Sequence, residues 1–112
     1  MNIKIAIVDD HPVVREGIKN IIKEQSDEIV VNGEASNGKE FLNLYHRQNS
    51  DVYLIDISIP HINGIEVTRR ILEIDSNAKI LIMSFHEEEK YVKQSFLVGA
   101  KGYFLKEDAI QS

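Results

Sequence analysis

Short apolar runs alternate along this chain with longer stretches in which apolar residues recur at helical spacing. The first run, at 3–8, is rich in β-branched residues, similar short runs recur at 51–55, 79–83 and 101–105, and a weaker run lies near 28–35. Runs this short and this continuously apolar are typical of strands that are buried on both faces, as in a parallel sheet. The pattern therefore predicts five strands separated by helices.

The stretches between the runs carry residues that usually begin helices. Pro12 suits the first turn of a helix, and Asn37 with Glu40 three residues later predicts a capping box. Asn63 is placed to cap a third helix. Each of these residues stands just ahead of an amphipathic stretch, so we expect helices there.

A fourth helix is expected between the acidic segment 87–89, where the helix dipole favours negative charge, and Gly99, a natural C-terminal glycine. After the last run, residues 107–112 predict the start of a fifth helix. This alternation predicts a parallel sheet with right-handed crossovers and helices on both faces. In such folds ligands bind beyond the carboxyl ends of the strands.

Composition limits the possible functions. The chain has 112 residues, enough for one domain (1–112), of which 43% are hydrophobic and 28% charged. The net charge of −5 gives no basic surface for nucleic acid or an anionic membrane. Without cysteine there are no disulfides or thiolate metal sites, and no apolar run reaches the roughly 18 residues of a membrane span. No signal peptide precedes the first run, so we expect a cytoplasmic protein.

Polar residues stand at the carboxyl ends of the predicted strands. Asp9 and Asp10 follow the first run and Asp56 the third, while Ser84 and Lys106 follow the fourth and fifth. Parallel strands would bring these groups to one edge of the sheet. Carboxylates packed together repel unless a cation lies among them, and Mg²⁺ accepts such ligands while keeping water sites for a phosphate oxygen. This set predicts phosphoryl transfer, with one carboxylate as nucleophile.

Each of these residues also has a simpler explanation. Asp10 alone would be a turn or cap residue, Ser84 a small strand-end hydroxyl, and Lys106 a solvated lysine. Asp56 is harder to explain in this way, because a carboxylate beside a core strand is costly to bury without a partner. The coincidence of all these groups at strand ends favours the functional interpretation.

Five segments together resemble the receiver domains of bacterial two-component response regulators. They are Ile-Val-Asp-Asp-His-Pro (7–12), Leu-Ile-Asp-Ile-Ser-Ile-Pro (54–60), Asn-Gly (63–64), Ile-Met-Ser (82–84) and Gly-Ala-Lys-Gly-Tyr-Phe-Leu-Lys (99–106). The first and last segments are most similar to the NarL/FixJ subfamily. The resemblance implies a flavodoxin-like (βα)₅ fold, doubly wound, with strand order 2-1-3-4-5 and here a shortened last helix.

The resemblance also implies a role for each matching carboxylate. Asp56 would accept a phosphoryl group from the phosphohistidine of a sensor histidine kinase. Asp9 and Asp10 would hold Mg²⁺ together with Asp56 itself, and Ser58 would add its backbone carbonyl as a metal ligand. The domain would be a signalling switch that catalyses only its own phosphorylation and dephosphorylation.

The remaining matches concern the phosphoryl group and the signal that follows. Lys106 would pair with the phosphoryl group and Ser84 would hydrogen-bond to it. Tyr103 stands at the position of the family's aromatic switch residue, whose rotamer follows that hydroxyl. An inward movement of Ser84 would leave space for Tyr103 and reshape the surface of the fourth helix and fifth strand.

Other positions would tune the switch. Ser58 and His86 stand where this family adjusts the lifetime of the phosphate, and the bulk of Phe85 beside Ser84 would hinder access to the phosphoryl group. We expect His11 and His61 to shape loops without a chemical role.

The short segment at the end of the sequence leads to two further expectations. Few residues follow Lys106, so we expect most of the fifth helix and a DNA-binding output domain to be missing from this fragment. The apolar surface exposed by a short last helix would favour a homodimer or an exchanged assembly.

Three other functions share part of this pattern. A haloacid-dehalogenase-type phosphohydrolase also uses an aspartate nucleophile and Mg²⁺, but places its Asp-x-Asp pattern after the first strand. A flavodoxin-like electron carrier would need a glycine-rich phosphate loop after the first strand, and none is present. A receiver-like interaction module that is never phosphorylated stays open, although the intact set of polar strand-end residues argues against it.

Overall fold

The computed structural model describes residues 2–45, 49–59, 62–85 and 88–110. Strands and helices alternate through these residues in the order that the apolar pattern predicts. The elements are β1 (Ile3–Val8), α1 (Pro12–Gln25), β2 (Ile29–Ala35), α2 (Gly38–Tyr45), β3 (Val52–Asp56), α3 (Gly64–Ile74), β4 (Ile80–Ser84), α4 (Glu89–Leu97), β5 (Gly102–Leu105) and α5 (Lys106–Ile110).

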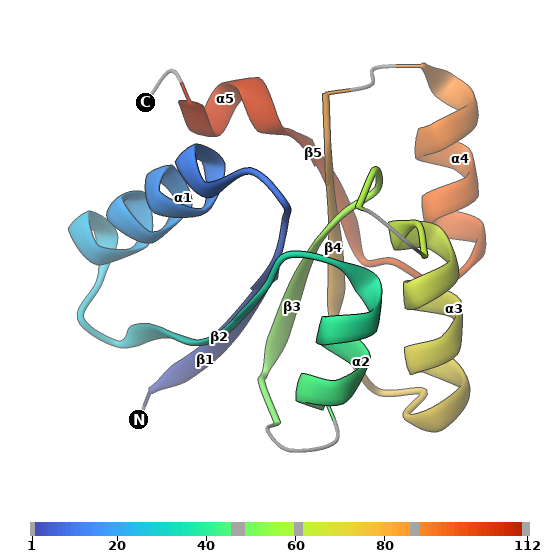
Figure 1. Ribbon diagram of the computed structural model, residues 1–112, viewed down its shortest axis with the longest axis horizontal. Helices are drawn as coiled ribbons and strands as arrows, with labels where there is room; N and C mark the ends of the chain where they lie inside the picture. The colour runs from blue at the N-terminus through green and yellow to red at the C-terminus, as the bar shows by residue number, and fades with distance from the viewer. Residues whose placement is uncertain (1, 46–48, 60–61, 86–87, 111–112) are drawn as a thin grey trace.

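The strands form a parallel five-stranded sheet in the order β2-β1-β3-β4-β5. Helices α1 and α5 cover one face, and α2, α3 and α4 cover the other (Figure 1). The predicted doubly wound fold and its strand order are therefore confirmed. The direction of winding changes between β1 and β3, so the carboxyl ends of these two strands border the crevice in which such folds bind ligands.

Two apolar clusters hold the helices against the sheet. The larger cluster joins Ile55 of β3 to Phe41 of α2 and Ile71 of α3, all fully buried. The smaller cluster lies on the opposite face and joins Ile7 of β1 to Ile18 of α1. Because both faces are covered by apolar side chains, the strand ends are where this sheet can present polar groups.

The first two helices begin at the residues that the sequence indicates. Pro12 lies in the first turn of α1, where its missing N–H leaves no hydrogen bond unmade. Asn37 Oδ1 accepts the N–H of Glu40 at 2.8 Å. The Glu40 carboxylate, however, accepts the N–H of Ser36 at 3.2 Å, so the reciprocal half of the capping box lies one residue earlier than predicted.

The later helix boundaries agree in part with prediction. Asn63 caps α3 by accepting the N–H of Glu66 at 2.9 Å, and Gly99 follows α4 with a φ of 113°, a conformation that favours glycine. Helix α4 begins at Glu89, inside the acidic segment 87–89 from which the sequence expected it to start. Helix α5 begins at Lys106 itself, one residue earlier than expected.

Strand β2 is the least regular element of the sheet. It lies at the edge, and its pairing with β1 shifts by one residue between Ile5 and Ala6. Only Ala35 at its end is fully buried, which explains why its apolar run is weak in the sequence. None of the helices in the described part of the chain combines the length and the apolar character needed to cross a bilayer.

Candidate functional site

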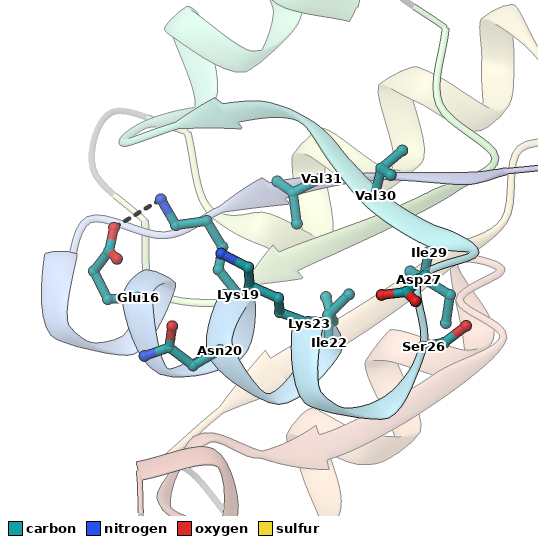
Figure 2. A pocket seen from close by; sticks show the side chains of 10 residues that line it. All are labelled: Glu16, Lys19, Asn20, Ile22, Lys23, Ser26, Asp27, Ile29, Val30 and Val31. Carbon is teal, nitrogen blue, oxygen red and sulfur yellow. Dashed lines mark ion pairs between the residues drawn. The ribbon is translucent and has the colours of Figure 1, made fainter.

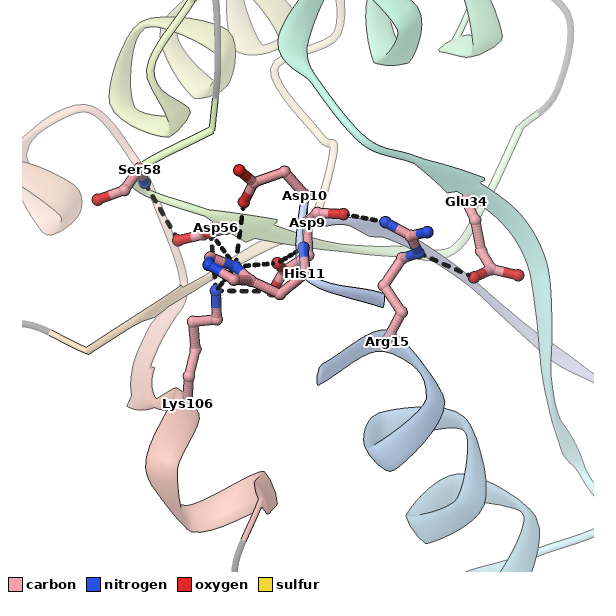
Figure 3. A network of polar contacts seen from close by, with 8 residues as sticks. All are labelled: Asp9, Asp10, His11, Arg15, Glu34, Asp56, Ser58 and Lys106. Atoms are coloured by element: carbon pink, nitrogen blue, oxygen red, sulfur yellow. Dashed lines mark hydrogen bonds and ion pairs between the residues drawn. The ribbon is translucent and has the colours of Figure 1, made fainter. Parts of the chain in front are cut away.

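Two buried carboxylates from neighbouring strands meet at the carboxyl edge of the sheet. Asp9 follows β1 directly and Asp56 is the last residue of β3, and the pairing of Val8 with Ile55 places them next to each other. Asp9 is fully buried and Asp56 is 1% exposed. Asp10 lies beside them, partly exposed (Figure 3). The predicted convergence of the three acids is therefore present in the structure.

Lys106 extends into this acidic pocket from the start of α5. Its ammonium nitrogen lies 2.8 Å from Asp56 Oδ2 and 2.9 Å from Asp9 Oδ2, and the side chain is 1% exposed. Strand β5 is separated from β3 by β4, so the long lysine side chain is what brings a cation to the acids (Figure 3). The ammonium offsets part of the negative charge that burial makes costly.

The surroundings of Asp56 act on its protonation in opposite directions. Burial raises the pKa of this carboxyl, while the hydrogen bond from Lys106 and the N–H of Ser58, which donates to Asp56 Oδ1 at 3.1 Å, lower it. Burial is the largest effect, and the net result is a pKa above the ordinary value of 3.8. The hydrogen bonds from Lys106 and Ser58 therefore do not fully offset the cost of burying the negative charge of ionised Asp56.

The oxygen atoms of the pocket suit a divalent cation. Among the described residues, Asp9 Oδ2 and Asp10 Oδ1 are buried acceptors that receive no hydrogen bond of normal geometry, although Lys106 lies close to the first. Ligand atoms of Asp9, Asp10, His11 and Asp56 all lie within 4.8 Å of one another. Unsatisfied carboxylate oxygens so close together fit a hard cation such as Mg²⁺. The contribution of the exposed Ser58 through its carbonyl stays a prediction.

Ser84 and Tyr103 lie on the same face of the sheet. Ser84 ends β4 and is fully buried, and Tyr103 of β5 pairs with Ile82, two residues before Ser84. Side chains two positions apart on a strand share a face. Tyr103 is half-buried and packs against the cluster that contains Ile82, on the side covered by α2, α3 and α4. A coupled movement of this pair stays a prediction.

His11 lies in the pocket, which the sequence did not lead us to expect. Its Nδ1 is 2.9 Å from Asp9 Oδ1 and 3.0 Å from Asp10 Oδ1 (Figure 3). Arg15, one helical turn further on, donates to the main-chain oxygen of Asp9 and lies 3.3 Å from Glu34. The position of His11 immediately after two site acids was the available signal, but sequence alone does not fix where a ring points.

Phe85 covers one side of the pocket. Its side chain is 48% exposed, and the Lys106 ammonium lies 4.9 Å from the centre of its ring. The bulk that we predicted beside Ser84 is therefore next to the site. His86, the other residue expected to tune phosphate lifetime, lies outside the described residues.

A hollow of about 460 Å³ lies between the second half of α1 and the start of β2 (Figure 2). Ile22 and Ile29 contribute apolar surface to it, and Lys19 pairs with Glu16 at its rim at 2.7 Å. Ile29 pairs with Ile3 at the start of β1. The hollow thus lies toward the amino ends of the strands, away from the acidic pocket at their carboxyl ends.

The model of the response regulator receiver domain family matches residues 5–111. The chain belongs to this family. This receiver domain is 41% identical over 106 residues to the transcriptional regulatory protein DegU of Brevibacillus brevis, which covers 94% of the receiver domain and 44% of DegU. It is 36% identical over 103 residues to the nitrate/nitrite response regulator protein NarL of Escherichia coli K12, covering 92% and 47% of the two chains.

A solved structure agrees with these relatives. The receiver domain is similar to a two-component response regulator of the LuxR family from Aurantimonas sp. SI85-9A1, with a TM-score of 0.88 and 36% identity over 95% of this chain and 75% of that one. The subfamily resemblance seen in the sequence is confirmed: this is a NarL/LuxR-type receiver domain of a two-component response regulator. The chain spans about half the length of the curated relatives it matches.

Proposed function

We propose that this receiver domain is a phosphorylation switch in which Asp56 accepts a phosphoryl group from a sensor histidine kinase, with Mg²⁺ bound beside it. The supporting observation is the excess of negative charge in the pocket. Three carboxylates lie together where one buried ammonium, that of Lys106, contacts two of them. A purely structural ion pair would need only one acid, whereas phosphoryl transfer needs a nucleophile and a place for a divalent cation.

The transfer exchanges one bond to phosphorus for another. A carboxylate oxygen of Asp56 attacks the phosphorus, the phosphorus–nitrogen bond to the kinase histidine breaks, and its electron pair stays on the departing imidazole. Lys106, whose ammonium lies 2.8 Å from Asp56, would neutralise the incoming phosphoryl oxygens. Asp9, Asp10, Asp56 and the carbonyl of Ser58 would hold Mg²⁺, which would supply positive charge to offset that of the phosphoryl oxygens. Attack by water on the same phosphorus later removes the group, so the domain acts only on itself.

The phosphoryl group then changes packing on the sheet. A new dianion at Asp56 draws the Ser84 hydroxyl toward it, and Tyr103 fills the space behind. The conformations with Tyr103 turned outward and inward would both exist before phosphorylation, and phosphorylation would shift their populations. Phe85 beside the pocket and His86 next to it in sequence would set how readily donors and water reach the phosphoryl group.

The signal would pass to a DNA-binding output in a longer protein, since the matched relatives include transcriptional regulatory proteins about twice as long as this chain. The receiver itself would contact the kinase and not nucleic acid, consistent with its net charge of −5. We propose that the phosphoryl transfer takes place in the cytoplasm. A homodimer or exchanged assembly is part of the proposal, and a strictly monomeric mass by light scattering would contradict that part.

Intact-mass spectrometry tests the proposal. The protein is incubated with acetyl phosphate and Mg²⁺ beside Asp56→Asn and the control Asp27→Asn, which removes an exposed carboxylate in the loop between α1 and β2. We expect one phosphoryl adduct in the wild type and in Asp27→Asn and none in Asp56→Asn. No adduct in any protein would favour the inert interaction module, and rapid repeated consumption of the donor would favour the phosphohydrolase.

A further inference from the structure

His11 Nδ1 lies at the centre of the acidic pocket. It is 2.9 Å from Asp9 Oδ1, 3.0 Å from Asp10 Oδ1 and 3.9 Å from Asp56 Oδ2. The Lys106 ammonium lies 2.9 Å from the same nitrogen. One ring atom therefore lies within 3.0 Å of two acceptors and one donor, with a third acceptor 3.9 Å away.

No protonation state of the ring satisfies all of these neighbours. A protonated Nδ1 can donate to one carboxylate, but it then meets the Lys106 ammonium with a second N–H. An unprotonated Nδ1 can accept from Lys106, but its lone pair then lies 2.9 to 3.0 Å from the oxygens of Asp9 and Asp10. A divalent cation among these atoms would resolve the conflict, because the lone pair and the carboxylate oxygens would all face positive charge.

The spacing of the atoms fits such a cation. Adjacent ligands of an octahedral ion with bonds of about 2.1 Å lie about 3.0 Å apart, and opposite ligands about 4.2 Å apart. The separations of Nδ1 from Asp9 Oδ1 and Asp10 Oδ1, 2.9 and 3.0 Å, match neighbouring positions. The separation from Asp56 Oδ2, 3.9 Å, is closer to that of opposite positions.

The ring is also held in place. The His11 N–H donates to Asp9 Oδ1 at 2.8 Å, which fixes the start of the side chain against the pocket. Pro12 follows and restricts the backbone. On the outer side, the ring of Phe85 meets the imidazole edge to face, with centres 6.2 Å apart. A donor atom fixed in this way loses little entropy when it binds a metal.

We propose that His11 supplies Nδ1 as a nitrogen ligand to the cation of this pocket and thereby shifts its preference from Mg²⁺ toward ions that favour imidazole, such as Co²⁺. Carboxylate and carbonyl oxygens suit Mg²⁺, whereas imidazole suits later divalent transition metals. The inference rests on the proposed function only in requiring a divalent cation beside Asp56.

Calorimetric titration of the untagged protein with Co²⁺ and with Mg²⁺ tests the assignment. Removing the nitrogen in His11→Ala should weaken Co²⁺ binding by at least about tenfold and Mg²⁺ binding by less than about threefold. His11→Asn, which offers an amide oxygen instead, should retain Mg²⁺ binding and lose the Co²⁺ preference. An equal loss of affinity for Co²⁺ and Mg²⁺ would indicate that His11 has only a structural role and would overturn the proposal. Unchanged affinity for both ions would overturn it as well.

Pulsed electron paramagnetic resonance with Mn²⁺ gives a second measurement. We expect a coupling from a directly bound nitrogen in the wild type, absent in His11→Ala and retained in the control His46→Ala. A wild-type spectrum without that coupling would contradict the proposal. Phosphorylation of Asp56 is measured separately in Mg²⁺, so a protein that binds Co²⁺ through His11 but gains no phosphoryl group would contradict the proposed function alone.

Discussion

The Lys106 ammonium lies 2.8 Å from the Asp56 carboxylate, although the two residues are 50 positions apart in the chain and both are buried. The contact joins the end of β3 to the start of α5 across the end of β4. It ties the last element of the domain to the residue that we propose as phosphoryl acceptor. The stability of the fold and the chemistry of the pocket therefore depend on the same pair.

Replacing Lys106 with methionine keeps the length of the side chain and removes its charge. The acids Asp56 and Asp9 would then be buried without the ammonium, so we expect the free energy of unfolding at pH 7 to fall by about 3 kcal/mol without added metal. Urea denaturation measures this change. Lys101→Met, at an exposed lysine, is the matched control and should change stability by less than about 0.5 kcal/mol. Equal stability of the two variants would contradict the role assigned to the pair.

Asp56→Asn should stabilise the metal-free fold at neutral pH. Because the pKa of Asp56 is raised in the folded state by burial, the folded protein binds that proton more tightly than the unfolded chain does. The stability this provides is fully present below the unfolded pKa and is lost as pH rises through the folded one. Asparagine avoids the loss, so the variant should be more stable than the wild type at pH 7.

The comparison is made by urea denaturation with a chelator present. The advantage of Asp56→Asn should shrink as the pH falls through the raised folded pKa and vanish below the ordinary value of 3.8, where the wild-type carboxyl is protonated in both states. Asp27→Asn should show no such pH-dependent difference. A variant that is less stable than the wild type at pH 7 would show that Lys106 more than compensates for burial.

Gly64 allows α3 to begin against the acceptor strand. A Cβ at this position would lie 2.4 Å from the main-chain oxygen of Asp56 and 2.8 Å from the Cα of Ile57. Gly64→Ala should therefore displace the end of β3, lower the free energy of unfolding by about 2 kcal/mol and reduce phosphorylation. Asn63→Ala should cost about 1 kcal/mol through loss of the helix cap but leave phosphorylation nearly unchanged. Similar phosphorylation in both variants would contradict this account.

The proposed coupling of Ser84 to Tyr103 predicts a spectroscopic change. Beryllium fluoride with Mg²⁺, an analogue of the phosphoryl group, should shift the ¹⁹F resonance of fluorotyrosine at position 103, assigned through Tyr103→Phe. In Ser84→Ala the shift should be lost, because no hydroxyl moves toward the added anion. A shift of equal size in Ser84→Ala would show that the ring responds independently of the serine.

The fold and the position of the acids could be predicted because they follow from chain-long patterns. The inner strands β1, β3 and β4 are largely buried on both faces, so their apolar runs are continuous, and the polar residue that ends each run is conspicuous. Strand β2 was weaker in the sequence because Asn-Gly-Glu at 32–34 interrupts its apolar run, and Ala35 alone is fully buried in it. In parallel strands, order and direction then bring Asp9 and Asp56 together without further information.

Side-chain directions could not be predicted in the same way. Whether His11 turns into the pocket depends on its χ angles, on the hydrogen bond from its N–H to Asp9 and on the ring of Phe85, which is far away in the sequence. Likewise, sequence indicated a lysine at the pocket but not that one ammonium would contact Asp9 and Asp56 at once. These are tertiary contacts, and the local sequence around each of the groups does not predict them.

The most direct test of the central claim is chemical identification of the phosphorylated residue. The protein is treated with acetyl phosphate and Mg²⁺, reduced with borohydride, which converts an aspartyl phosphate to homoserine, and mapped by tandem mass spectrometry. The account predicts homoserine at position 56 and unmodified aspartate at positions 9 and 10. Homoserine at another aspartate, or none in a protein shown to bind Mg²⁺, would contradict it.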